Sequence, residues 1–473
     1  MKNDLKFGTS GLRGLVSALT DDVCQNYTLA FLNHLKASKK LTPDMALIVG
    51  HDLRASSPHI SKIIMDTASS YGVHVMNAGA LPTPALALSA LNNHCPAIMV
   101  TGSHIPEDRN GLKFYTSEGE ITKQDELSIL YHLEIVKPII KDKKEYPLNP
   151  SILAAYRKRC LAILPENSLQ NLRIGVYQHS SVARDLLIDI LKQLGAQTFV
   201  YARSDHFIPI DTEALSQNDR DFVLNTVKEN SLDALISTDG DADRPLIAGS
   251  DGHFVKGDLI GLLTAQYLGA DAVVTPVTSS SAIELSHLFQ RIYRCRVGSP
   301  YVIAEMEEAV TDGYNTIIGF EANGGVLLGS DVTTEQGILK KLPTRDAILP
   351  ILCLLGLAHL QGNSVQALMA ELPHRFTASN RLTNIDTEKA SRILDTLDDG
   401  TTRVHFFHSM GKITHWDTID GLRVIFDNGD IIHYRLSGNA PEMRCYCEAS
   451  TQKKADNNLT WGLNKMAHAI DKL

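Results

Sequence analysis

Features that mark disulfide-bonded, membrane-bound or nucleic-acid-binding proteins are missing from this sequence. Its seven cysteines are odd in number and include no Cys-x-x-Cys pair, which favours reduced thiols in a cytosol over a disulfide framework. No stretch reaches 18 apolar residues, and the opening "MKNDLKFGTSGLRG" has no apolar signal-peptide core. The 54 acidic residues outnumber 45 lysines and arginines, giving a formal charge of −9, which argues against nucleic acid or an anionic membrane as the main partner. We therefore expect a cytoplasmic globular protein.

The length and composition predict several folded domains. At 473 residues the chain is longer than one hydrophobic core usually organises, so three or four domains are expected. A hydrophobic share of 44% and a charged share of 21% are ordinary for globular proteins. The net negative charge does not exclude a small anionic substrate, because arginines gathered at one site can override the overall sign.

Most of the sequence repeats one α/β plan. An apolar run, a serine-rich turn and a helix-like pattern begin at Met45, Leu172 and Asp271, which is typical of a strand followed by a helix. A second strand and then a third follow each time, and the third ends in an unusual loop: "PAIMVTGSHIP", "DALISTDGDADR" and "NTIIGFEANGG". One α/β module used three times is the simplest interpretation, and chance similarity among strand–helix units is the alternative. The predicted modules cover residues 1–150, 151–252 and 253–365.

The last hundred residues follow a different pattern. From Arg403 the segment "RVHFFHSMGKITHWDTIDGLRVIFDNGDIIHYRL" alternates apolar and polar residues around Asp-Gly and Asn-Gly turns, which indicates antiparallel strands. A helical segment follows at the C-terminus. We predict a fourth domain of α+β type over residues 366–473. In open α/β sheets, ligands bind at the carboxyl ends of the strands, so the loops that follow the strands are the candidate functional segments.

The clearest chemical signal is the metal loop, "STDGDADRPLI". Asp239, Asp241 and Asp243 recur at every second residue, and carboxylates so close together repel one another unless a cation shares them. Oxygen ligands in a compact loop suit Mg²⁺, and Arg244 adds a donor for an anion beside the metal. Pro245 and a missing glutamate at loop position 12 exclude an EF-hand. A solvated acidic turn is the plain structural alternative.

The serine loop, "TGSHIPEDRNGLKF", places Ser103 beside His104, with Lys113 ten residues after the serine. A serine hydroxyl beside a divalent cation could be a nucleophile, or could carry a phosphoryl group whose oxygen completes the metal shell. His104 and Lys113 would then stabilise charge or move protons. A surface turn with a chance histidine is the alternative, because adjacent residues in an extended chain point opposite ways. The sequence has no Gly-x-Ser-x-Gly elbow and no evident acid to orient His104, which disfavours an esterase triad.

Three further loops carry groups that bind sugars and phosphates. The sugar loop, "GFEANGG", contains Glu321 and Asn323, and a carboxylate with an amide suits vicinal sugar hydroxyls. The N-terminal turn "GTSGLRG" offers Thr9, Ser10 and Arg13 to an anion. The phosphate loop, "RLSGNAPEMR", would cradle a phosphate with side-chain donors, backbone N–H groups and two arginines. Its members are Arg435, Ser437, Gly438, Asn439 and Arg444. Each of these loops alone could be an ordinary turn.

In this order, the motifs resemble those of the α-D-phosphohexomutase superfamily. They are "FGTSGLRG", "TGSHIPEDRNGLKF", "DGDADR", "GFEANGG" and "RLSGNAPEMR", and together they span the whole chain. The resemblance implies an enzyme that interconverts hexose 1- and 6-phosphates. It also implies four domains around a central cleft: three with a shared mixed α/β topology and a C-terminal α+β domain with an antiparallel sheet.

The same resemblance implies a role for each loop. Ser103 would be a phosphoserine whose phosphate shares Mg²⁺ with the three aspartates of the metal loop. Its phosphoryl group would pass to a hexose monophosphate, giving a hexose 1,6-bisphosphate that reorients and returns its other phosphate. The phosphate loop would hold the non-reacting phosphate and the sugar loop the 3,4-hydroxyls in both orientations. Charge on the transferring group would be balanced by Arg13, His104, Lys113 and Arg244.

The chain departs from the usual motifs of the superfamily at Gly102, Ile105, Ser299, Asn323, Gly325 and Ala440. Ser299 and Gly325 stand where relatives carry histidine, which leaves the general acid/base unassigned. Lys113 and His104 are the candidates for that role, and Lys113 is preferred. At Ala440 the phosphate loop lacks a carboxylate that is common among relatives.

The serine, sugar and phosphate loops together most resemble the phosphomannomutase branch. We predict an isomerase of carbohydrate metabolism that interconverts mannose 6-phosphate and mannose 1-phosphate with Mg²⁺, as a monomer or dimer without nucleic-acid or membrane partners. Its ligands would be hexose monophosphates and a hexose 1,6-bisphosphate. Phosphoglucomutase activity, alone or in addition, is the alternative within the superfamily, and phosphoglucosamine mutase is less favoured. Outside it, the alternatives are a Mg²⁺-dependent sugar-phosphate phosphatase, a glycosyltransferase and a silent binding protein.

Overall fold

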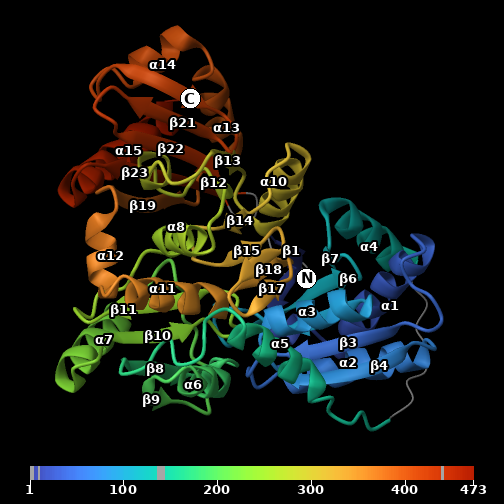
Figure 1. The fold of residues 1–473 in the computed structure, drawn as a ribbon. Coiled ribbons are helices and arrows are strands. Elements are labelled where there is room, and N and C mark those ends of the chain that lie inside the picture. The colour runs from blue at the N-terminus through green and yellow to red at the C-terminus, as the bar shows by residue number, and fades with distance from the viewer. Residues whose placement is uncertain (1–4, 9–10, 136–143, 438–440, 473) are drawn as a thin grey trace. The chain divides into compact units, whose positions relative to one another are not determined.

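The computed structural model describes residues 5–8, 11–135, 144–437 and 441–472 (Figure 1). The chain divides into two compact units, and each is described by itself. Unit 1 consists of Met1–Val273 and Gly298–Met369, and unit 2 consists of Val274–Val297 and Ala370–Leu473.

The first sheet of unit 1 mixes parallel and antiparallel strands in the order β1-β2-β6-β5-β3-β4, with β7 paired to β6. Strand β3 is parallel to β4 and β5, whereas β5 is antiparallel to β6. The strands are β1 Lys6–Phe7, β2 Leu12–Leu15, β3 Ala46–His51, β4 His74–Ala80, β5 Ala97–Val100, β6 Arg109–Thr116 and β7 Gly119–Glu120.

One hydrophobic core joins this sheet to α1, α2 and α4. It includes Phe31 and Phe114, whose ring centroids lie 5.0 Å apart. Thr20 caps α1, because its side chain accepts a hydrogen bond from the N–H of Val23, a position where threonine favours a helix start. The helices are η1 Val16–Ala18, α1 Asp21–Ala37, α2 Ser57–Ser70, α3 Thr83–Asn93 and α4 Lys123–Ile135.

Two further sheets repeat the plan of the first. In the second sheet, of order β11-β10-β8-β9, strand β8 is parallel to β9 and β10, and β10 is antiparallel to β11. The third sheet has the order β13-β12-β14-β15-β18, with β14 antiparallel to β15. The same four-strand order recurs in β4-β3-β5-β6, β9-β8-β10-β11 and β13-β12-β14-β15. This recurrence confirms the predicted α/β module used three times. The exact domain boundaries stay a prediction.

The strands of these two sheets are β8 Arg173–His179, β9 Gln197–Arg203, β10 Ala234–Thr238, β11 Pro245–Gly249, β12 Ala272–Pro276, β13 Arg291–Cys295, β14 Ile317–Phe320, β15 Val326–Leu328 and β18 Leu342–Asp346. A small sheet pairs β16 Val332–Thr334 with β17 Gly337–Leu339. The helices are α5 Ser151–Leu161, α6 Arg184–Gln193, α7 Gln217–Asn230, α8 Gly257–Tyr267, α9 Ala282–Leu285, α10 Ser299–Thr311, α11 Ile348–Leu360 and α12 Val365–Glu371.

Helix α11 carries apolar residues on all sides, which is consistent with its burial over most of its length. Among the described residues, no helix by itself has the length and apolar character to cross a membrane. The bent pair of α11 and α12 meets that criterion by length and composition only.

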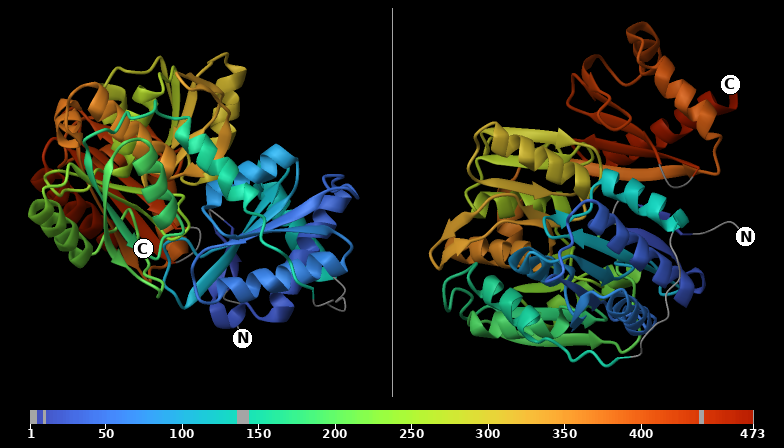
Figure 2. Two further views of the ribbon diagram at one scale, coloured as in Figure 1. Left: turned by 60° about the horizontal axis from the view of Figure 1, so that its bottom comes forward. Right: turned by 90° about the vertical axis from the view of Figure 1, so that its right-hand side faces the viewer.

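The C-terminal part of unit 2 is an antiparallel sheet of order β19-β23-β22-β21-β20 covered by helices (Figure 2, orange to red). Helices α13 and α15 contribute Ile393 and Met466 to its core. The Asp-Gly and Asn-Gly turns end at Gly421 and Gly429, both with positive φ. The predicted antiparallel C-terminal domain is confirmed. Its elements are β19 Phe376–Thr383, α13 Thr387–Thr396, α14 Gly400–Phe406, β20 Ile413–Asp417, β21 Leu422–Phe426, β22 Ile431–Leu436, β23 Glu442–Ala449 and α15 Gln452–Lys472.

One detail of that prediction is wrong. The residues from Arg403 were expected to begin the antiparallel sheet, but they lie in helix α14. The side chain of Asp399 accepts a hydrogen bond from the N–H of Thr402 and so caps this helix. An aspartate in this position favours a helix start. This effect outweighs the short alternation of apolar and polar residues that follows it in the sequence.

A buried ion pair after β3 holds the serine loop in unit 1. The guanidinium of Arg54 donates to Asp52 and lies 3.8 Å from the ring centroid of Phe207. A Cβ on Gly102 would come within 2.7 Å of the Arg54 guanidinium carbon, so a glycine there leaves room for this side chain. The same guanidinium donates to four backbone carbonyls at 2.6–3.1 Å: those of Ser103, Ile105, Pro106 and Arg109.

Replacing Arg54 by methionine should leave Asp52 buried without its cation and the serine loop without its donors. We expect the free energy of unfolding to fall by about 3–5 kcal/mol, measured by urea denaturation. The double variant Asp52→Asn/Arg54→Met should recover part of that loss, because no buried charge is left unpaired. Equal losses in the single and double variants would show that the ion pair does not hold this loop.

A buried histidine makes the stability of unit 2 depend on pH. His433 stacks on Tyr446, with 5.4 Å between ring centroids, and its Nε2 lies 2.6 Å from the carbonyl oxygen of Asp420. Burial, reinforced by the charge of Arg423, lowers the pKa of His433 to about 4. An unfolded histidine titrates near pH 6.5, so the unfolded state takes up a proton first as the pH falls. The stabilisation is therefore present above about pH 6.5 and is lost towards about pH 4.

We expect His433→Gln to flatten the dependence of the unfolding free energy on pH by about 2 kcal/mol between pH 7 and pH 5. Urea denaturation at the two pH values measures this difference. His415→Gln, on an exposed part of β20, is the matched control because it removes a histidine without touching the core. Parallel pH profiles of His433→Gln and the wild type would contradict the prediction.

Candidate active site

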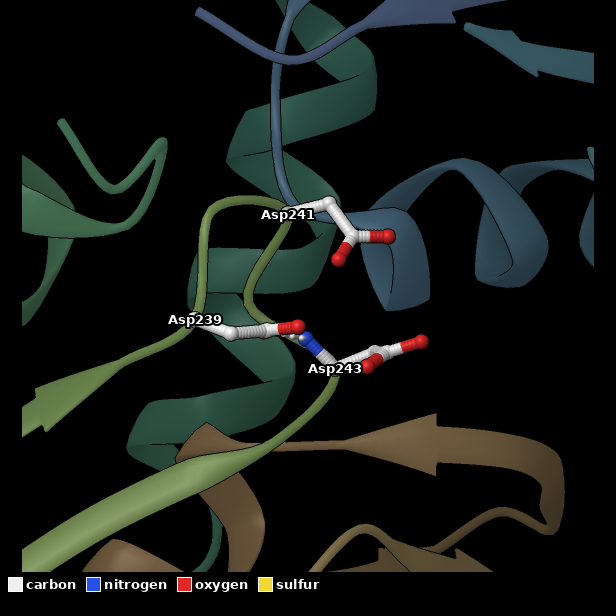
Figure 3. Close-up of side chains that lie close together, drawn as sticks. All are labelled: Asp239, Asp241 and Asp243. Atoms are coloured by element: carbon white, nitrogen blue, oxygen red, sulfur yellow. Dashed lines mark hydrogen bonds between the residues drawn. The ribbon is translucent and has the colours of Figure 1, made fainter. Parts of the chain in front are cut away.

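The metal loop connects β10 to the antiparallel β11 and gathers three carboxylates (Figure 3). One oxygen from each of Asp239, Asp241 and Asp243 lies within 4.8 Å of the others, and all three residues are buried. Ala242 takes a positive φ of 58°, which tightens the turn between them. The sequence prediction that these aspartates form one cluster is confirmed.

The free oxygens of this cluster fit a metal ion. Oδ1 of Asp241 and Oδ1 of Asp243 are buried and accept no hydrogen bond within the described part of the chain. Burial and the charges of the two other aspartates raise the pKa of Asp239 well above its ordinary value. Oxygen-only ligands in so small a space suit a hard divalent cation, so these residues could hold one.

Ser103 reaches this cluster from the serine loop. Its Oγ donates to Oδ2 of Asp239 at 2.6 Å and lies 3.2 Å from Nδ1 of His104. The residue is fully buried and adopts a positive φ of 54°, and its N–H bonds to the hydroxyl of Thr101 at 2.8 Å. The left-handed backbone turns the hydroxyl toward the metal loop. The proximity of Ser103 and the aspartates, on which the sequence interpretation depended, is therefore present.

Lys113 contributes a cation from β6. Its Nζ lies 2.6 Å from Oδ2 of both Asp241 and Asp243. Burial lowers the pKa of Lys113, but the two carboxylates outweigh burial and the pKa is raised. Lys113 is therefore held as a cation. Burial alone would raise the pKa of Asp243, but Arg345, Lys113 and Arg244 hold it well below its ordinary value.

The other sequence-predicted groups around the serine are two arginines and His104. Nε and Nη2 of Arg13, on β2, are buried without a hydrogen-bond partner among the described residues. Burial, Arg244 and Arg345 lower the pKa of Arg13 to about 10. Nε of Arg244 lies 3.7 Å from Oδ1 of Asp243. Burial, followed by the charges of Arg244 and Arg13, lowers the pKa of His104 to about 2, so its imidazole is neutral.

The sugar loop follows β14 and meets the same site in unit 1. Oδ1 of Asn323 accepts the N–H of Gly325 at 2.9 Å, and its amide lies 3.3 Å from Oε2 of Glu321. That Glu321 oxygen also accepts a hydrogen bond from Nη1 of Arg345 at 2.8 Å, while Nη2 of the same arginine binds Asp243 at 2.8 Å. One guanidinium thus connects the sugar loop to the metal loop.

The phosphate loop belongs to unit 2, between β22 and β23. Arg435 and Arg444 are paired across these strands, and Nε of Arg435 donates to Asp420 at 2.6 Å. The N–H of Ser437 bonds to the carbonyl of Glu442 at 3.0 Å. Some predicted anion-binding residues lie outside the described residues: Thr9, Ser10, Gly438 and Asn439.

Several residues of the site were not identified from the sequence. Arg345 is the last residue but one of β18, in "KLPTRD", and Thr83 begins α3 after β4, in "GALPTP". The hydroxyl of Thr83 donates to Oδ2 of Asp241 at 2.5 Å, and its N–H bonds to the carbonyl of the same residue at 2.9 Å. Arg54 holds the serine loop. In each case the one signal was a polar residue within or shortly after a strand, and this pattern does not say what the residue contacts.

Comparison with known proteins agrees with this architecture. Three family profiles match the chain: "Phosphoglucomutase/phosphomannomutase, alpha/beta/alpha domain I" at residues 4–135, domain II at residues 154–252 and domain III at residues 256–376. The crystal structure of a phosphoglucomutase/phosphomannomutase family protein from Burkholderia thailandensis has a similar fold, with a TM-score of 0.77 at 19% identity. That alignment covers 98% of this chain and 97% of the other.

Two curated proteins are similar in sequence over almost their whole length. A phosphomannomutase of Salmonella muenchen is 44% identical over 462 residues, which are 96% of this chain and 94% of that protein. A phosphomannomutase of Sinorhizobium fredii is 41% identical over 464 residues, covering 97% and 98%. With the three matched domains, these similarities show that the chain belongs to the phosphoglucomutase/phosphomannomutase family.

Proposed function

We propose that this chain is a phosphomannomutase that interconverts mannose 6-phosphate and mannose 1-phosphate through a phosphoserine at Ser103. Two relatives of that name, at 44% and 41% identity over nearly the whole chain, support the reaction. The observation that carries the choice of residue is the 2.6 Å contact between Oγ of Ser103 and Asp239 in the three-aspartate cluster. A phosphoryl group on that oxygen would lie at the metal loop.

Asp239, Asp241 and Asp243 would hold the metal ion, and we propose Mg²⁺ because all the free ligand atoms are carboxylate oxygens. When bound, Mg²⁺ would supply positive charge to the oxygens of the transferring phosphoryl group. The chain adds its own cations. Lys113 and Arg244 lie beside the aspartates, and together with Arg13 they would balance the charge that develops during transfer.

The transfer exchanges one phosphorus–oxygen bond for another. A hydroxyl oxygen of the hexose monophosphate attacks phosphorus, the bond from phosphorus to Oγ of Ser103 breaks, and the hydroxyl proton is passed on to that Oγ. The second half-reaction reverses these changes at the other end of the hexose 1,6-bisphosphate. Oγ of Ser103 donates to Asp239 at 2.6 Å, and Nδ1 of His104 lies 3.2 Å from the same oxygen, so we assign His104 to hydrogen bonding at this oxygen. Lys113, preferred from the sequence, bridges two carboxylates and is assigned to charge balance.

The remaining loops would recognise the parts of the substrate that do not react. Glu321 and Asn323 offer an acceptor and an amide to sugar hydroxyls. The phosphate loop would hold the non-reacting phosphate with Arg435, Ser437, Gly438, Asn439 and Arg444. Energy from that distant contact would then position the reacting end.

Phosphoglucomutase activity is the alternative within the family, since a relative from Thermococcus kodakarensis, 25% identical over 496 aligned residues, is a "Phosphoglucomutase/phosphomannomutase". A Mg²⁺-dependent sugar-phosphate phosphatase is the alternative outside it. A cytoplasmic location and a monomeric or dimeric state stay predictions.

Ser103→Ala should abolish turnover of mannose 1-phosphate, by about a thousandfold or more in kcat, while leaving its binding largely unchanged, because the variant lacks only the phosphoryl carrier. A coupled assay measures turnover and calorimetry measures binding. In the wild type, intact mass should show a fraction heavier by one phosphoryl group, located at Ser103 and lost on incubation with mannose 1-phosphate.

The same assay separates the alternatives. Glucose 1-phosphate and glucosamine 1-phosphate should react with lower kcat/KM than mannose 1-phosphate. Steady release of inorganic phosphate by an unmodified chain would instead identify a phosphatase. Normal turnover by the Ser103→Ala variant would overturn the phosphoserine assignment.

Metal binding should depend on the aspartate cluster. We expect Asp241→Asn and Asp239→Asn to weaken Mn²⁺ binding by about a hundredfold or more, since even outer partners of metal ligands typically contribute about 10–100-fold. Calorimetry with Mn²⁺ on the chelator-treated protein measures the affinity without any assay of turnover. Asp205→Asn, an exposed carboxylate in unit 1, is the control. Unchanged Mn²⁺ affinity in both cluster variants would rule out this site.

A further inference from the structure

A single buried arginine joins the two carboxylate-bearing loops of the site. Arg345 stands near the end of β18 and is 3% exposed. Its Nη2 and Nε lie 2.8 and 3.2 Å from Oδ2 of Asp243, and its Nη1 lies 2.8 Å from Oε2 of Glu321. The planar fork of a guanidinium holds two carboxylates at a fixed separation, which a lysine ammonium on a flexible stem does not do.

The sugar loop leaves space for this arginine. A Cβ on Gly325 would come within 2.6 Å of Cδ of Arg345 and 3.0 Å of the carbonyl oxygen of Asp243. Any larger residue at position 325 would therefore displace the arginine or the metal loop. The glycine at position 325 and the buried Arg345 are therefore linked by packing.

A third carboxylate supports Arg345 from β7. Glu120 accepts hydrogen bonds from the hydroxyls of Thr344 at 2.7 Å and Ser299 at 2.8 Å. Thr344 precedes Arg345 on β18, and the charge of Glu120 adds to those of Asp243 and Glu321 in opposing the effect of burial on the pKa of Arg345, which is raised. Ser299 thus helps to fix an anion whose charge acts on the guanidinium of Arg345.

We propose that Arg345 is a positioning residue with two effects. It fixes Glu321 for binding the sugar, and through its ion pair with Asp243 it lowers the affinity of the aspartate cluster for its metal ion. The inference rests on the proposed function for its sugar half. It predicts effects of opposite sign. Without the guanidinium, Glu321 loses its anchor and sugar binding weakens, whereas Asp243 loses a competing cation and metal binding tightens.

Arg345→Met should raise the KM for mannose 1-phosphate by about tenfold or more, the usual effect of losing a hydrogen bond to a charged group. The same variant should lower the Kd for Mn²⁺ by about tenfold, because one positive charge beside the ligands is removed. Calorimetry on chelator-treated protein measures the Kd. Parallel weakening of both ligands would overturn the proposal, because general damage to the site has that signature.

Arg345→Lys separates charge from geometry and keeps a cation in the core. It should leave the Kd for Mn²⁺ within about twofold of the wild type while the KM stays raised, because an ammonium cannot span both carboxylates. A wild-type KM in this variant would overturn the proposal. If Arg345→Met does not fold, judged by its melting curve, this lysine variant decides the test.

Glu321→Gln tests whether the arginine acts on the sugar through Glu321. This variant should raise the KM and leave Mn²⁺ binding unchanged, and Arg345→Met/Glu321→Gln should have a KM no higher than Glu321→Gln alone. Additive losses would overturn the proposal. Arg403→Lys is the control, since it alters another buried arginine that binds backbone carbonyls in unit 2.

Failure of the proposed function would be distinguishable from failure of this inference. Wild-type turnover of mannose 1-phosphate is measured first, and its absence would reject the proposed function alone. The Mn²⁺ titrations of Arg345→Met and Arg345→Lys would still report on Asp243. With turnover present, only the Arg345 and Glu321 variants bear on the role of the guanidinium.

Discussion

Repulsion among three buried carboxylates organises the centre of unit 1. Burying a charge without a partner costs several kcal/mol, and Asp239, Asp241 and Asp243 are all buried within one short loop. The chain offsets this cost with cations from other elements: Lys113 from β6 and Arg345 from β18. Because each cation is placed by its own strand, the ion pairs connect β6 and β18 to the metal loop.

The backbone of these loops explains why the reactive groups meet. Each loop follows a strand whose neighbours in the sheet are fixed, so its start is rigid. Ser103 and Ala242 then take left-handed conformations, with φ of 54° and 58°, which non-glycine residues adopt only when the surroundings determine them. In the serine loop, Arg54 stabilises this backbone conformation by donating hydrogen bonds to the loop carbonyls. A serine held in this conformation by a buried arginine can present its hydroxyl oxygen in one fixed position.

The sequence predicted what is encoded locally and missed what depends on distant contacts. The repeated α/β module, the aspartate cluster and the Asp-Gly and Asn-Gly turns all follow from short patterns. The helix at α14 was missed because a capping aspartate decided it. Arg345 could not have been found in this way, since its partner Asp243 lies 102 residues away in the chain. Ser299 and Gly325 were noted as departures from the motifs, but their contacts with Glu120 and Arg345 depend on distant parts of the chain.

The same set of charges also distinguishes Lys113 from His104, the two candidates that the sequence left for the general acid/base. Lys113 and His104 both lie in the charged site, yet their surroundings act on them in opposite directions. The carboxylates of Asp241 and Asp243 keep Lys113 protonated despite its burial, whereas burial and the charges of Arg244 and Arg13 keep His104 neutral. A permanent cation suits the charge on a phosphoryl group, whereas the neutral imidazole adds no charge at the serine oxygen, where its Nδ1 lies 3.2 Å from Oγ. The different charge states therefore arise from the neighbours of each side chain, and residue type alone does not decide them.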